Sequence, residues 1–63
     1  MKKQTYFINV LSNGKDALFT AICKNTDLEY AKSVGRKLWT VASEPYYFWI
    51  LDEEQNEIFN HKK

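Results

Sequence analysis

Residues 5–15 read TYFINVLSNGK and carry the clearest hairpin signal in the chain. Residues 5–11 are mostly β-branched or aromatic, which favours a strand. The Asn13-Gly14 pair that follows can supply the two positive φ angles of a type I′ turn. More apolar residues come after the turn, so the stretch predicts two antiparallel strands joined by a two-residue loop.

A two-residue loop also fixes which residues face each other. The predicted pairs are Ser12 with Lys15, Val10 with Ala17, Ile8 with Phe19 and Tyr6 with Ala21. Successive side chains of a strand point to opposite faces, so the hairpin has two predicted faces. One carries Tyr6, Ile8, Val10, Ala17, Phe19, Ala21 and Cys23, and the other carries Phe7, Asn9, Leu11, Asp16, Leu18, Thr20 and Ile22.

A helix is expected directly after the hairpin. Thr26 with Glu29 three residues later forms a predicted capping box, and Asp27 also suits a helix start. Apolar residues at helical spacing form one stripe, which consists of Leu28, Ala31, Gly35, Leu38 and Ala42, flanked by Val34 and Val41. Glycine is unfavourable inside a helix, so Gly35 indicates a close approach of helix to sheet. Pro45 is expected to end the helix at Ser43-Glu44.

The C-terminal third predicts a second hairpin. Residues 46–51 and 57–60 are the expected strands, and 52–56 are the polar turn between them. The result is a single two-layer α+β domain spanning 1–63 with the element order ββαββ. Its sheet is expected to be antiparallel in the order 2-1-3-4, with the helix on one face, and residues 1–4 and 61–63 are expected to fray.

One helix covers only one face of a sheet, yet both faces of this sheet are apolar. Residues 46–51 are all apolar or aromatic. We expect Phe48 and Ile50 to point inward together with Tyr46, and Tyr47, Trp49 and Leu51 to point outward. The reason is that tyrosine and tryptophan tolerate partial solvent exposure better than phenylalanine and isoleucine do. The expected protein-binding patch on the uncovered face then consists of Phe7, Leu18, Ile22, Tyr47, Trp49 and Leu51.

Two groups of charged residues are candidate contacts. Lys32, Arg36 and Lys37 lie on the polar side of the predicted helix and suit phosphates or an acidic partner. The acidic group comprises Asp52, Glu53, Glu54 and Glu57, and it suits a basic groove on a target. Solvated surface is the commoner explanation for each group.

Signals of enzymatic chemistry are nearly absent. The only histidine, His61, is near the C-terminus, and Cys23 has no predicted base beside it, so Cys23 is interpreted as a small core residue. The sequence contains no zinc-ligand spacing, phosphate-binding loop or EF-hand pattern. We therefore expect no catalytic residues, no metal and no cofactor. A single cysteine and no apolar run long enough for a membrane span favour a soluble cytoplasmic protein.

The chain has 63 residues, a net charge of +1 and an aromatic content of 16%. This length leaves no room for a second domain, and the near-neutral charge argues against dominant nonspecific nucleic-acid binding. In size and layout the chain resembles the small binding and inhibitor proteins of phages and other mobile elements. The expected function is a non-enzymatic module that binds another protein. The alternatives are a homodimeric structural subunit and a nucleic-acid-binding regulator that uses the basic helix face and the sheet aromatics.

Overall fold

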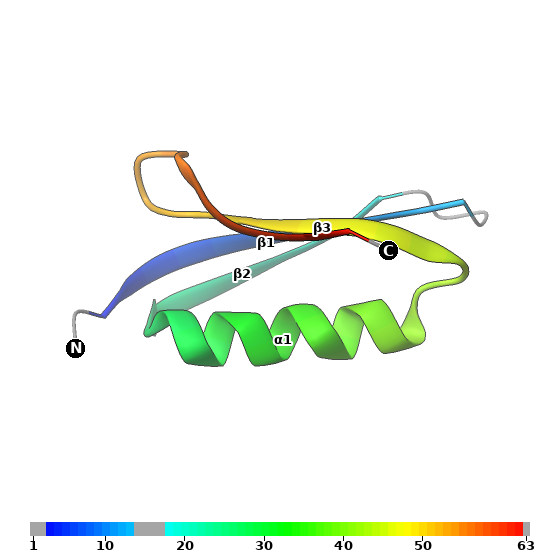
Figure 1. Ribbon diagram of the computed structural model, residues 1–63. Helices are drawn as coiled ribbons and strands as arrows, with labels where there is room; N and C mark the ends of the chain where they lie inside the picture. The colour runs from blue at the N-terminus through cyan, green and yellow to red at the C-terminus, as the bar shows by residue number, and fades with distance from the viewer. Residues whose placement is uncertain (1–2, 14–17, 63) are drawn as a thin grey trace.

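The computed structural model describes residues 3–13 and 18–62, which form one antiparallel sheet and one helix. The elements are β1 (Gln4–Ser12), β2 (Leu18–Thr26), α1 (Leu28–Val41), β3 (Pro45–Leu51) and β4 (Glu57–Lys62). The strand order is β2-β1-β3-β4, and α1 lies along one face of the sheet (Figure 1). The predicted α+β class, element order and strand order are confirmed.

The pairing of the first hairpin differs from the predicted register by two residues. Ile8 faces Ala21 rather than Phe19, and the last pair before the connection, among the residues that the structure describes, is Leu11 with Leu18. The connection is therefore longer than the Asn13-Gly14 loop that we expected, and Gly14 itself lies outside the described residues. A shift of two residues leaves every side chain on its predicted face, because side chains alternate with a period of two.

The core lies between α1 and the two central strands. Its buried members are Tyr6, Ile8, Val10, Ala31, Ala42, Phe48 and Ile50. The inward orientation of Phe48 and Ile50 is confirmed, whereas Tyr46 is 41% exposed and does not belong to the core. The pairing of β1 with β3 shifts between Leu11–Tyr47 and Ser12–Pro45, so Tyr46 sits in a bulge.

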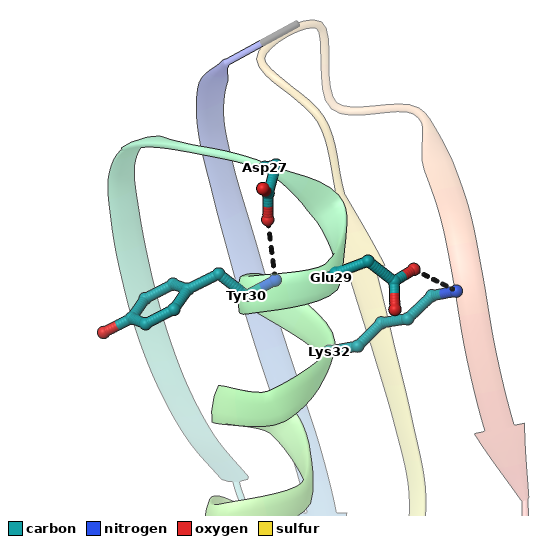
Figure 2. Close-up of polar contacts among 4 residues, drawn as sticks. All are labelled: Asp27, Glu29, Tyr30 and Lys32. Carbon is teal, nitrogen blue, oxygen red and sulfur yellow. Dashed lines mark hydrogen bonds and ion pairs between the residues drawn. The ribbon is translucent and has the colours of Figure 1, made fainter. Parts of the chain in front are cut away.

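The helix begins one residue later than the predicted capping box implies. Asp27 is the N-cap, and its Oδ1 accepts a hydrogen bond of 2.9 Å from the backbone N–H of Tyr30 (Figure 2). Thr26 instead ends β2, where it pairs with Gln4. Because Thr26 is still part of β2, the next residue, Asp27, caps the helix. Val41, predicted to flank the buried stripe, is 72% exposed.

Three of the residues that the sequence predicted to fray lie in strands of the sheet. Gln4 belongs to β1, and His61 and Lys62 belong to β4, where they pair with Phe48 and Tyr47. These positions therefore lie in paired strands rather than in frayed ends.

Gly35 marks the closest approach of α1 to the sheet. A Cβ atom placed there would lie 2.7 Å from Cε1 of Phe48 and 3.4 Å from Cγ2 of Ile8. The first distance is shorter than side-chain packing tolerates. The close approach inferred from the sequence is confirmed, and it holds the ring of Phe48 directly under the helix.

Candidate functional site

The face of the sheet without a helix is a grid of three cross-strand rows, which we call the open face. The first row is Ile22, Phe7, Leu51 and Glu57. The second row is Thr20, Asn9, Trp49 and Asn60. The third row is Leu18, Leu11, Tyr47 and Lys62. All six residues of the predicted patch therefore lie on this face.

Exposure is uneven across the open face. Leu18 and Ile22 on β2 are 54% and 56% exposed, whereas Phe7, Trp49 and Leu51 are half-buried by their neighbours. The middle row is polar on the β2 side, where Thr20 Oγ1 donates a 3.0 Å hydrogen bond to Asn9 Oδ1. The Asn9–Thr20 pair thus separates the two apolar rows on β1 and β2. On β3, Trp49 lies between the rows and connects them.

Tyr47 and Trp49 form the aromatic centre of the open face. Their rings stack with centroids 5.1 Å apart and an interplanar angle of 23°. The hydroxyl of Tyr47 donates a 3.2 Å hydrogen bond to Oε1 of Glu57, and the ammonium of Lys62 lies 5.7 Å from its ring centroid. Burial and the nearby Glu57 carboxylate raise the pKa of Tyr47 above its ordinary value. Two β4 side chains thereby contact the Tyr47 ring of the stacked pair.

The acidic residues of the second hairpin have structural partners. Asp52 Oδ1 accepts 2.9 Å hydrogen bonds from the backbone N–H groups of Glu54 and Asn56, which shapes the turn. Glu53 Oε2 accepts a 3.1 Å hydrogen bond from the backbone N–H of Thr5. Glu57 likewise accepts hydrogen bonds from Tyr47 and Asn60, so the predicted acidic contacts do not form one free acidic surface.

The basic residues lie on α1, on the other side of the sheet from Tyr47 and Trp49. Lys32 pairs with Glu29 at 3.4 Å (Figure 2). The Lys32 ammonium also lies 4.7 Å from the ring centroid of Phe59 on β4. Arg36 and Lys37 are exposed. The structure thus brings together the six apolar residues, and it separates them from the three basic ones.

Sequence reasoning missed a groove between α1 and β4. It has a volume of about 390 Å³ and is lined by Arg36, Trp39, Thr40, Phe48, Phe59 and His61. The ring of Trp39 meets that of His61 edge-on at 5.0 Å. In a strand, Phe59 and His61 lie on the same face. Extending the predicted strand 57–60 to Lys62 would therefore have placed His61 beside the core.

No arrangement suited to nucleophilic catalysis involves Cys23 and His61, because they lie on strands at opposite edges of the sheet. Burial raises the pKa of the Cys23 thiol, which lowers its reactivity. Across residues 3–13 and 18–62, no three histidine, cysteine or acidic side chains lie together as a metal site. In the same residues, α1 is too short and too polar to span a membrane.

Comparison of the chain with protein-family models, with curated proteins and with solved structures gives no match.

Proposed function

We propose that the protein is a small non-enzymatic binding module that inhibits or regulates another protein by covering part of that protein's surface with the open face. The observation that carries this proposal is the stacked Tyr47–Trp49 pair, in which Tyr47 is also bonded to Glu57 of β4, on the sheet face opposite α1. Aromatic side chains that are already ordered lose little conformational entropy on binding, and they are enriched at the centres of protein interfaces.

The composition of the open face suits a protein partner. Apolar rows flank the Asn9–Thr20 pair, and Glu57 and Lys62 lie at one border. An apolar centre with a polar border is the usual anatomy of a protein interface. Exposed apolar surface on a domain this small also favours a partner that covers it.

The nucleic-acid alternative is less well supported by this geometry. It requires single-stranded bases to stack on the sheet aromatics while cations contact the phosphates. Tyr47 and Trp49 lie on the open face, whereas Arg36 and Lys37 lie on the helix that covers the opposite face. One strand of nucleic acid would have to pass around the sheet to contact both groups.

The test is affinity capture from the source cell with the tagged full chain, analysed for both protein and nucleic acid. Wild type, Trp49→Ala and Arg36→Ala are compared, and circular dichroism confirms that each variant keeps its helix. We expect one protein to be retained by wild type and Arg36→Ala, and its affinity for Trp49→Ala, measured with purified partner, to fall at least about tenfold. Equal binding by wild type and Trp49→Ala would refute the proposed interface. Nucleic acid captured by wild type and lost with Arg36→Ala would support the alternative instead.

A further inference from the structure

The strand β2 (Leu18–Thr26) is an edge of the sheet with little protection. It pairs only with β1, so the backbone N–H and C=O groups on its other side have no partner strand in the part of the chain that the structure describes. Leu18–Cys23 pair with β1 without a register shift, and β2 contains no proline and one charged residue, Lys24. Proteins usually protect exposed edges with charges, prolines, bulges or short strands, because an open edge accepts another strand.

The other edge of the sheet is better protected than β2. The strand β4 has six residues, compared with nine in β2, and although both edge strands have a register shift, the shift of β2 lies at its Thr26 end and leaves Leu18–Cys23 regular. It carries charged Glu57 and Lys62 and ends near the C-terminus. Strand addition is therefore favoured at β2 and disfavoured at β4.

Exposed apolar side chains lie on both sides of the β2 edge. Leu18 and Ile22 project from its open face. On the helix side, Tyr30 is 57% exposed and extends from α1 toward the β2 side of the sheet, away from Lys32 (Figure 2). Val41 follows Tyr30 by eleven residues, close to three helical turns, so both belong to one stripe of α1, which also carries the exposed Lys37 between them. A partner at this edge would cover apolar surface in both layers.

The centre of the β2 edge and the centre of the Tyr30–Val41 stripe lie at the same height along the strands. The regular part of β2, from Leu18 to Lys24, is centred on Ala21, because Asn25 leaves the extended conformation with φ 53°. The stripe from Tyr30 to Val41 is centred near Gly35. Gly35 packs on Ile8, and Ile8 pairs with Ala21. A single two-fold axis beside Ala21 therefore relates both layers symmetrically.

We propose that β2 pairs antiparallel with β2 of a second copy of the chain about this axis, which joins two four-stranded sheets into one of eight strands. The strands then match Ala21 with Ala21, Thr20 with Ile22, Phe19 with Cys23 and Leu18 with Lys24 of the second copy. Lys24 meets an apolar side chain rather than the like charge of its counterpart. The two open faces become one continuous surface, so the dimer is compatible with the proposed function but does not depend on it.

The helices of the two copies lie on the same face and run antiparallel. Each helix covers β1, so their axes stand about 14 Å apart, which is three strand spacings. This exceeds direct helix contact and leaves a channel above the two β2 strands. Tyr30 of one copy lies level with Val41 of the other, and the long tyrosine side chain is suited to fill the channel. The net charge of +1 gives little repulsion between copies.

The first measurement is the mass of the purified full chain in solution as a function of concentration. We expect a mass of twice 7.5 kDa at high concentration, and dissociation on dilution. Tyr30→Lys is expected to raise the dimer dissociation constant at least about tenfold, because it places a charge in the channel. Tyr30→Phe is the matched control and should dimerise like wild type. A monomer at every concentration would overturn the proposal.

Crosslinking locates the interface. In a Cys23→Ala background, Ala21→Cys is treated with a short bis-maleimide, and Asn60→Cys on β4 is the matched control at the other edge. We expect covalent dimer from Ala21→Cys and almost none from Asn60→Cys. Dimers that are disrupted by Trp49→Ala but not by Tyr30→Lys would place the interface on the open face and overturn the β2 pairing. Trp49→Ala tests the open face, whereas Tyr30→Lys tests the β2 edge. A negative result for the β2 dimer therefore leaves the proposed function of the open face unaffected.

Discussion

Gly35 is the single residue on which the distance between helix and sheet depends. In Gly35→Ala the new methyl group would meet the ring of Phe48 at 2.7 Å, and that ring is confined by Trp39 and Phe59. Overpacking of this kind costs about 1–3 kcal/mol, whereas alanine regains about 1 kcal/mol of helix propensity. We expect a net loss of about 1 kcal/mol in the free energy of unfolding, measured by urea denaturation. Lys37→Ala, at an exposed position of the same helix, should change stability little. A Gly35→Ala protein more stable than wild type would mean that the close contact is absent.

The fold raises the pKa of the Tyr47 hydroxyl. Its pKa lies above 10.0 because burial and the Glu57 carboxylate both disfavour the phenolate. A pKa that is raised on folding stabilises the protein below the unfolded value, and the stabilisation is lost as the pH rises through the folded value. Relative to Tyr47→Phe, wild type should therefore lose stability only above about pH 10. Glu57→Gln should lower the pKa of Tyr47, measured by phenolate absorbance with Tyr47→Phe for assignment. An unchanged titration in Glu57→Gln would contradict the contact.

At the scale of the element, the start of α1 depends on one side chain. Asp27 accepts the backbone N–H of Tyr30, which is one of the unpaired donors of the first turn. Asp27→Ala should lower the free energy of unfolding by about 1 kcal/mol, whereas Asp27→Asn should retain most of it because asparagine caps equally well. Glu29→Gln removes only an exposed ion pair with Lys32 and should have a small effect. Equal stability of Asp27→Ala and wild type in urea denaturation would show that the cap contributes nothing.

The elements also show how far local sequence patterns reach. Strand alternation placed Ile8 and Phe48 correctly in the core, even though the predicted loop of the first hairpin was too short. Alternation is insensitive to a two-residue shift, whereas the register itself depends on a loop whose length the pattern does not fix. The exposed position of Tyr46 follows from a bulge against β1, which is set by long-range pairing.

In the candidate site, too, local patterns predicted some features, whereas others depend on long-range strand pairing. The excess of aromatic residues predicted that Tyr47 and Trp49 would lie on a face without a helix. The roles of Glu57 and Lys62 beside Tyr47 required the pairing of β3 with β4, which no short-range pattern encodes. The groove at Trp39 was missed for the same reason, because it depends on where β4 ends.

At the scale of the whole molecule, the single described helix is too narrow to cover the whole width of the four-stranded sheet. The Cα atoms of α1 approach those of β1, β2 and β3 within 8 Å, but none of those of β4. On the β4 side, long side chains bridge the interval, with Lys32 over Phe59 and Trp39 against His61. On the β2 side, Tyr30 and Val41 of α1 stay exposed. The off-centre position of the helix thus creates both the groove at β4 and the uncovered edge at β2.

This layout predicts that β4 opens before the rest of the protein unfolds. Separation of β4 from β3 exposes Phe59 and His61 but leaves α1 packed on Ile8 and Ile50, so it costs less than global unfolding. In hydrogen exchange followed by NMR, the amides of β4 should exchange faster than those of β1. Trp39→Ala removes an edge-on ring contact worth about 0.5–1.5 kcal/mol, so it should raise the exchange of β4 by up to about tenfold more than that of β1. Tyr30→Ala, on the other side of the helix, should leave the ratio of β4 to β1 exchange unchanged. Equal exchange rates in β4 and β1 of wild type would mean that the sheet opens as one cooperative unit.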